Sequence, residues 1–137
     1  MGGASRKTIN TSNGVSGFTE AEANILNEAR AILKSPEMAT IRSAHNAGES
    51  VTLNINGRIV QYEAGLNASG MTMFGEEGFV IGNQAFSSST ELTKTVLHEL
   101  YRLNMSASAE GVSAALIKAE TEAAFNFAER ACSAIIR

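Results

Sequence analysis

The chain has 137 residues, of which 44% are hydrophobic and 18% are charged, which is the size and composition of one globular domain. Its formal net charge of −3 at pH 7 argues against a protein that holds nucleic acid on a broad basic surface. A run of about 18 apolar residues is absent, so no membrane-spanning helix is expected. The only cysteine, Cys132, cannot form an internal disulfide and is expected to pack as a small apolar residue.

Two regions differ in composition. Residues 1–17 are rich in Gly, Ser, Thr and Asn and show no hydrophobic period, which predicts a flexible lead-in or linker. Residues 18–137 are predicted to form a single domain. The N-terminus has no apolar signal segment, so a signal for export is expected elsewhere, for example on a longer parent chain.

The domain is expected to begin with a helix. Thr19 and Glu22 have the spacing of a capping box, which predicts a helix from about Glu20 to Lys34. Pro36 is expected to mark its end, because proline cannot continue a helix. Glu37–Arg42 is expected to add only a short helical turn, and Ala44–Ser50 to be a loop that carries His45.

The clearest strand signal lies in Ser50–Glu63, where apolar and polar residues alternate. Asn56-Gly57 divides this segment into two runs, and this dipeptide favours a two-residue type I′ hairpin. The register that follows pairs Leu53 with Val60, and it places the apolar residues of both strands on one face.

The rest of the chain predicts the fold class. Met71–Phe74 and Phe79–Ile81 are expected to complete a small antiparallel sheet of three or four strands. A long helical tract is expected from about Ala109 to Ile136, after a polar break. An N-terminal helix, then strands, then two C-terminal helices predict an α+β fold with an antiparallel sheet.

The most informative segment is Ser88–Leu103, which is predicted to be the first of these two C-terminal helices. Ser88 and Glu91 have the spacing of a second capping box. One arc of the helical wheel is apolar and should face the core; it consists of Leu92, Val96, Leu97, Leu100 and Leu103. The opposite arc is polar, with Glu99 at its edge, and it consists of Glu91, Thr95, His98 and Arg102.

One interpretation of the polar arc is a metal site, because His98-Glu99 matches the start of the H-E-x-x-H zinc signature. The position of the second ligand is taken by Arg102, whose fixed charge opposes the binding of a dication. Zinc-dependent hydrolysis is therefore the less favoured alternative. The sequence does not tell whether His45, the other histidine, lies near His98.

A second interpretation is the metal-independent cleavage of RNA, in which a ribose 2′-OH attacks the neighbouring phosphate. The ordinary pKa of a histidine suits a proton acceptor or donor, which is the role expected for His98. The planar guanidinium of Arg102 matches phosphate oxygens. Hydroxyls such as that of Thr95 could donate hydrogen bonds. A polar arc is, however, more often a solvated face, so a noncatalytic protein-binding module stays open as an alternative. A protein-modifying transferase is a further possibility, for which the sequence shows no nucleotide-binding motif.

The run GFVIGNQAFSSSTELTKTVLHELYRL, together with the following NMSASAEGVSAALIKAETEAAFNFAERA, resembles C-terminal toxin domains of bacterial polymorphic effectors, notably contact-dependent growth inhibition proteins. The resemblance covers roughly Ser50 to Arg130, and HELYRL is its most distinctive part. It implies a toxic nuclease, most often a ribonuclease that cleaves tRNA. It also implies a fold of the barnase/EndoU/colicin/RelE type, in which helices pack on an antiparallel sheet.

The resemblance further implies export as part of a larger effector and action in the cytoplasm of the target cell, without a cofactor. The implied partners are a cognate immunity protein, the tRNA substrate and, for some such domains, elongation factor Tu. Carried to this chain, the resemblance makes His98 the acid or base and Arg102 the phosphate ligand. Thr95 or Thr93 would support them, and Glu99 would orient a neighbour. Thr93 is the weaker candidate, because it falls on the apolar side of the wheel.

Overall fold

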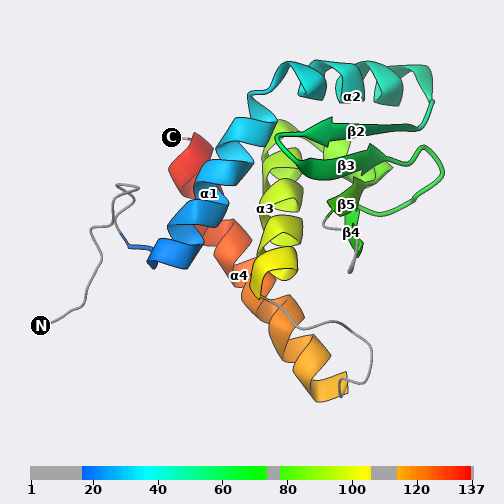
Figure 1. Cartoon of the computed structure of the whole chain (residues 1–137). Coiled ribbons are helices and arrows are strands. Elements are labelled where there is room, and N and C mark those ends of the chain that lie inside the picture. Colours follow the sequence, from blue (N-terminus) through cyan, green and yellow to red (C-terminus); the bar gives the residue numbers. More distant parts are fainter. Residues whose placement is uncertain (1–16, 74–77, 106–113, 137) are drawn as a thin grey trace, which may run out of the picture.

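The computed structural model describes residues 17–73, 78–105 and 114–136. Over these residues the fold is α+β, with four α-helices, a 3-10 helix and a four-stranded mixed sheet. Figure 1 shows helix α3 at the centre, with the sheet on one side of it and helices α1 and α4 on the other. The lead-in expected over 1–17 lies outside the described residues, apart from Gly17.

Helix α1, Glu20–Leu33, begins where the capping box predicts. The backbone N–H of Glu22 donates to Thr19 Oγ1 at 3.1 Å, and the N–H of Thr19 donates to Glu22 Oε1 at 3.1 Å. Both halves of the box are therefore present. The helix stops at its C-cap, Lys34, before the proline, so both expected ends are confirmed.

Helix α2, Pro36–Ala47, is longer than expected. The prediction of a short turn over Glu37–Arg42 followed by a loop is wrong, because Pro36 occupies the first turn of a new helix. Proline is well suited to that position, where its missing N–H would have no partner. Gly48 ends the helix in the left-handed conformation with φ 72°, as a C-terminal glycine often does.

Strands β2, Val51–Ile55, and β3, Arg58–Tyr62, form the predicted antiparallel hairpin. Asn56 and Gly57 have positive φ angles of 54° and 89°, as a type I′ turn requires. The predicted register is confirmed. Its inward pairs are Val51 with Tyr62, Leu53 with Val60, and Ile55 with Arg58.

Strands β4, Gly70–Met73, and β5, Gly78–Ile81, complete the sheet in the order β2-β3-β5-β4. Strand β5 is parallel to β3 and antiparallel to β4, so the sheet is mixed and not antiparallel as expected. All four residues of β5 are buried, which suits a central strand, whereas the partly polar β4 lies at the edge. Phe74, expected in β4, lies outside the described residues.

The inner face of the sheet consists of rows of paired residues that run from β2 across to β4. One row is Leu53, Val60, Phe79 and Thr72, and the next is Val51, Tyr62, Ile81 and Gly70. Each row is therefore apolar until it reaches β4, where it ends in a hydroxyl or in a residue without a side chain. These two row ends, Thr72 and Gly70, are the positions at which β4 meets helix α3.

Helix α3, Ser89–Met105, is preceded by the 3-10 helix η1, Asn83–Ser87. It contacts α1 and α4 as well as strands β4 and β5. The apolar arc faces the core as predicted, with Leu103 half-buried and with Leu92, Val96, Leu97 and Leu100 buried. The N–H of Glu91 donates to Ser88 Oγ at 3.0 Å, so this half of the second capping box is present.

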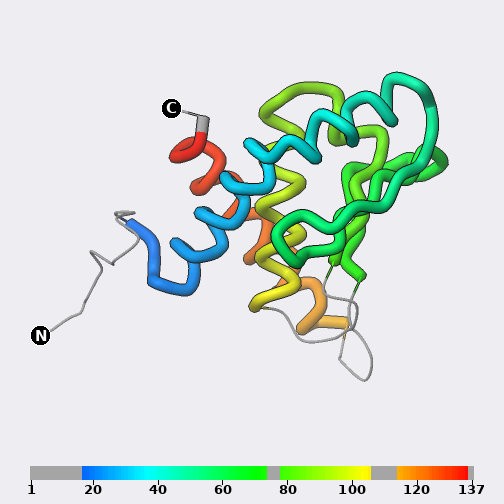
Figure 2. Tube along the Cα trace, turned by 45° about the horizontal axis from the view of Figure 1, so that its top comes forward, coloured from blue at the N-terminus to red at the C-terminus, as the bar shows by residue number. Residues whose placement is uncertain are grey.

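Helix α4, Ala114–Ile136, packs through its C-terminal half. The buried residues there are Ala124, Phe127, Ala128, Ala131 and Cys132, whereas Leu116 is 44% exposed. Figure 2 shows the N-terminal half extending past the end of α3. The expected start near Ala109 lies outside the described residues. Within the described part of the chain, no helix has the length and apolar character needed to cross a bilayer.

Candidate functional site

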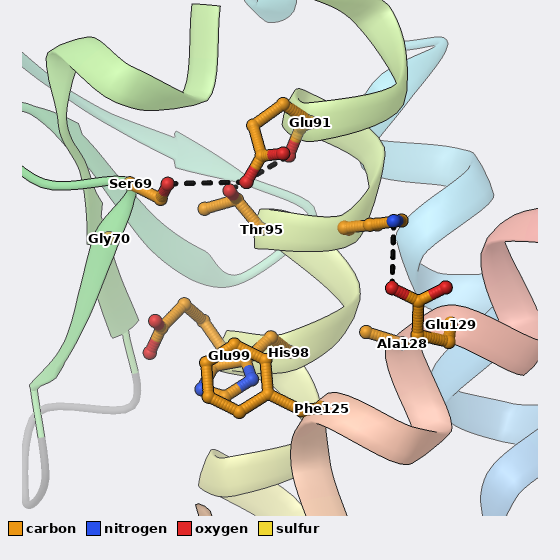
Figure 3. Close-up of a pocket in the computed structure, with 10 residues that line it drawn as sticks. Ser69, Gly70, Glu91, Thr95, His98, Glu99, Phe125, Ala128 and Glu129 are labelled. Atoms are coloured by element: carbon orange, nitrogen blue, oxygen red, sulfur yellow. Dashed lines mark hydrogen bonds and ion pairs between the residues drawn. The ribbon is translucent and has the colours of Figure 1, made fainter.

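A cleft of about 390 Å³ opens between strand β4, helix α3 and helix α4 (Figure 3). This volume lies within the range of clefts that bind small molecules. Its lining comes from three segments that are distant in sequence: Ser69 and Gly70; Glu91, Lys94, Thr95, His98 and Glu99; and Phe125, Ala128 and Glu129.

Gly70 lets β4 approach α3 closely beside the cleft. A Cβ atom at this position would lie 2.9 Å from Thr95 Cγ2 and 3.1 Å from Glu99 Oε2. It would also lie 3.0 Å from the carbonyl oxygen of Val80, which cannot move without disturbing β5. The absence of a side chain at Gly70 therefore sets the spacing between the edge strand and the helix.

Hydroxyl groups on or next to β4 bind carboxylates of α3. Ser69 Oγ donates to Glu91 Oε2 at 3.3 Å, and the Thr72 hydroxyl donates to Glu99 Oε1. Thr95 Oγ1 donates back to the carbonyl oxygen of Glu91 at 2.9 Å. The polar arc of α3 is thus not a fully solvated face. Its residue Thr95 is buried, and the arc runs along the cleft between β4 and α4 (Figure 3).

His98 lies against an exposed aromatic ring at the cleft. Its ring centroid is 4.4 Å from that of Phe125, at an interplanar angle of 47°. His98 is half-buried, and its Nδ1 is buried without a hydrogen-bond partner among the described residues. Phe125 is 59% exposed. A buried unpaired nitrogen is costly, on the order of 1–3 kcal/mol, and a catalytic role is one of the explanations for such a group.

The environment of His98 favours the neutral imidazole. Burial and, to a smaller extent, the positive charge of Arg102 together lower its pKa from 6.5 to about 4. At neutral pH the ring therefore carries no charge. In this form it can accept a proton or donate one hydrogen bond, but it is not a cationic acid.

The pKa of Glu99 is shifted in the opposite direction, upward. The residue is 5% exposed, and burial raises the pKa of its carboxyl, while the Thr72 hydroxyl and the Arg102 charge partly oppose that shift. The cleft therefore contains a base whose protonation is suppressed next to a carboxyl whose protonation is favoured. In both groups burial favours the neutral form, and shifted pKa values beside a cleft make the two residues candidates for a functional site.

The other two predicted site residues do not line the cleft. Arg102 is half-buried, and it acts there through its charge on His98 and Glu99. Thr93 is 7% exposed, on the core side of α3, as its place on the helical wheel indicates. The structure thus brings together Thr95, His98 and Glu99, and leaves Arg102 and Thr93 outside the cleft wall.

The charge of the cleft is predominantly negative. Its lining has the carboxylates of Glu91 and Glu129, the carboxyl of Glu99, whose protonated form burial favours, and one ammonium group, that of Lys94. Lys94 Nζ lies 2.8 Å from Glu129 Oε2, so much of its charge is already compensated. Such a lining favours neutral groups that donate hydrogen bonds over a polyanion.

The described residues do not support a metal site or a role for the second histidine. Over residues 17–73, 78–105 and 114–136, no three His, Cys, Asp or Glu side chains are grouped so that they could hold a metal ion. His45 lies in α2, where its ring stacks on Phe86 at 4.2 Å between centroids. It is not part of the cleft lining, which answers the question left open by the sequence.

Several lining residues were not identified from the sequence: Ser69, Gly70, Lys94, Phe125, Ala128 and Glu129. Their only common feature is their position in the folded chain. A local signal exists for Phe125 alone, since it lies two residues from the fully buried Phe127 and so cannot share its direction on one helix face.

No family model, no curated protein and no solved structure matches this chain. The resemblance to toxin domains therefore stays a prediction from the sequence. What the fold and the site define is an α+β protein whose central helix presents a neutral imidazole to a small, carboxylate-rich cleft.

Proposed function

We propose that this chain is a metal-independent ribonuclease and the toxin domain of a bacterial effector, with His98 as the general base. The observation that carries the proposal is the neutral imidazole of His98 at an open cleft, with an unpaired Nδ1 and an exposed aromatic ring beside it. The resemblance of the HELYRL region to toxin nucleases adds support from the sequence.

The reaction requires two proton transfers. His98 accepts the proton of a ribose 2′-OH, and the oxygen then attacks the adjacent phosphorus. The bond from phosphorus to the 5′ oxygen breaks, which yields a 2′,3′-cyclic phosphate. The leaving oxygen takes a proton, for which Glu99 is the candidate donor because its raised pKa favours the protonated form. Lys94, which lines the cleft, is the candidate for stabilising the phosphorane once the phosphate replaces Glu129 as its partner, whereas Arg102 lies outside the lining and contributes only its charge at a distance.

The acidic lining bears on how the substrate arrives. An RNA backbone is repelled by the excess of carboxylates, so tight binding of free RNA is not expected. This fits an enzyme to which tRNA is presented by another protein, a role that the resemblance assigns to elongation factor Tu for some toxin domains. A cognate immunity protein would protect the producing cell by covering the cleft.

The test is expression of the chain in bacterial cells, which supply any presenting protein, with total RNA analysed on a denaturing gel and with cleavage by the purified chain repeated in excess EDTA. We expect a discrete tRNA-sized fragment with the wild type and none with His98→Ala. His45→Ala is the matched control, because it removes the same side chain away from the cleft, and it should cleave normally. Circular dichroism verifies that both variants are folded. Full activity of His98→Ala would overturn the proposal.

A second candidate is a metal-dependent hydrolase that uses His98-Glu99. The observation that favours it is the excess of carboxylates in the cleft, since carboxylate and neutral imidazole are ligands of divalent ions. The described residues do not group three ligands, so we derive no step through a metal. Activity that is lost in EDTA and restored by Zn²⁺ would select this candidate. Unchanged RNA in cells that express the chain would favour a noncatalytic binding module instead.

A further inference from the structure

We infer that Phe125 is the surface on which an unpaired nucleobase of the substrate stacks, and that the carboxylates of the cleft set the preference among bases. This inference deepens the proposed function and rests on it, because it takes RNA as the substrate. It concerns a residue that the resemblance does not single out and that the reaction described above does not use.

The exposure of Phe125 is not explained by packing. It is 59% exposed, more than Met71, Met105 or Leu116, the other exposed large apolar residues of the described chain. The core of α4 accommodates an aromatic ring two residues later, since Phe127 is fully buried against Phe18 and Tyr101. The ring of Phe125 instead stands at the cleft, tilted against His98 (Figure 3).

A ring in this position offers a face to a planar ligand. The tilt of 47° between Phe125 and His98 means that the two rings are not stacked on each other. Bases stack on aromatic side chains with little dependence on sequence, and a stacked base here would bring its own ribose close to the imidazole. Phe125 would then position the 2′-OH for His98.

The size of the cleft limits the form of the substrate. A volume of about 390 Å³ admits a single nucleotide unit and not a base pair within a duplex. The substrate position is therefore an unpaired nucleotide in a loop, a bulge or an end, where a base can be turned outward.

The carboxylates add a preference among bases. Glu91 Oε2 accepts from Ser69 and Glu129 Oε2 accepts from Lys94, which leaves the other oxygen of each carboxylate able to accept from a ligand. Adenine, cytosine and guanine carry an exocyclic amine that can donate to a carboxylate, as in the pairing of Glu with cytosine N4. Uracil has no such amine, so we expect it to bind more weakly.

Binding of the four nucleoside 5′-monophosphates to the wild-type chain, measured by calorimetry, tests the inference, because a mononucleotide has no internucleotide bond that could be cleaved. Replacing Phe125 by Leu should weaken binding by roughly 5- to 150-fold, the value of one stacked base. Phe125→Trp should retain binding, because it keeps an aromatic face. Leu116→Ala is the control, since this residue lies on the same helix and outside the cleft lining, and it should bind as the parent does.

The outcomes separate this inference from the proposed function. Equal binding by Phe125→Leu and the parent, or binding of uridylate as tight as that of the other three, would overturn the inference. Unchanged kcat and KM of Phe125→Leu in a protein that cleaves RNA would overturn it while the proposed function stands. Binding that depends on Phe125 in a wild type that cleaves no RNA would support the inference and overturn the ribonuclease.

Discussion

His98 links the chemistry of the cleft to the stability of the fold. Its pKa is about 4 in the folded chain against 6.5 ordinarily, so between these values the unfolded chain binds a proton that the folded chain does not. Stability should therefore fall as the pH drops below 6.5, with the loss complete below about pH 4. The full effect is roughly 3 kcal/mol. Urea unfolding of wild type and His98→Gln across this range measures it.

Glu99 also contributes to the pH dependence of stability, so the pH profile of the wild type has to be compared with that of His98→Gln. Its raised pKa means that the folded chain holds a proton that the unfolded chain has released, so this contribution to stability is lost as the pH rises. The variant keeps Glu99, and the difference between the two pH profiles therefore isolates the histidine. Parallel profiles from pH 4 to 7 would show that His98 is not held in its neutral form.

Gly70 supports a second prediction at the scale of one residue. Gly70→Ala should destabilise the chain by about 1–3 kcal/mol, because the new methyl group has to displace the Val80 carbonyl, Thr95 or Glu99. Gly65→Ala is the matched control. A Cβ there would meet only Glu63 Oε2, at 3.8 Å, so no loss is expected. Thermal unfolding of both variants measures the difference, and equal midpoints would contradict the close approach of β4 to α3.

At the scale of elements, the edge strand β4 is joined to α3 by hydroxyl–carboxylate bonds. The hydroxyl of Thr72 ends an otherwise apolar row of the sheet and binds the buried carboxyl of Glu99. Removing the Thr72 hydroxyl leaves the buried carboxyl of Glu99 without this donor, and removing the carboxyl leaves the hydroxyl without its acceptor. The effects of the two changes on the free energy of unfolding should therefore be strongly coupled.

A double-mutant cycle measures that coupling. Thr72→Val should cost about 1–3 kcal/mol, because it leaves the Glu99 carboxyl without its donor. In the Glu99→Leu background, where no acceptor for the Thr72 hydroxyl remains, the same change should cost less, with a coupling of roughly 0.5–3 kcal/mol. Thr52→Val, at an exposed position of β2, is the control and should stay within about 0.5 kcal/mol. Additive effects of the two changes would show that the pair does not interact.

At the scale of the whole molecule, α3 is the element on which the others assemble. Helices α1 and α4 and strands β4 and β5 all contact it. A cavity in its apolar arc should therefore weaken the entire fold at once, and not one local segment.

Two leucines, one on α3 and one on α4, test this view. Leu100 is fully buried, so Leu100→Ala should cost about 2–5 kcal/mol through lost contacts and a residual cavity. Leu116 is 44% exposed on the projecting half of α4, so Leu116→Ala should change stability by no more than about 0.5 kcal/mol. Denaturant unfolding followed by circular dichroism gives both values. Similar costs for the two would contradict the burial that separates them.

The sequence by itself determined the features that depend on neighbours along the chain. The capping box at Thr19 fixed the start of α1, and Asn56-Gly57 fixed the hairpin together with its register. The apolar arc of α3 was equally readable, because helical periodicity shows which side chains share a face. Ser35-Pro36 and Gly48 are also local signals for α2, but the prediction takes Pro36 only as the end of the preceding helix and places Gly48 in a loop.

Only the tertiary structure decided what depends on segments far apart in the chain. Strand β5, not β4, lies beside β3, because a fully apolar strand gains most from a central place in the sheet. The cleft likewise forms only where three separate elements meet, since Gly70 lies on β4, His98 on α3 and Phe125 on α4. Periodicity indicates which side of an element faces inward, but long-range packing decides which element lies against that side. This packing brings the neutral imidazole of His98 and the exposed ring of Phe125 together at one cleft.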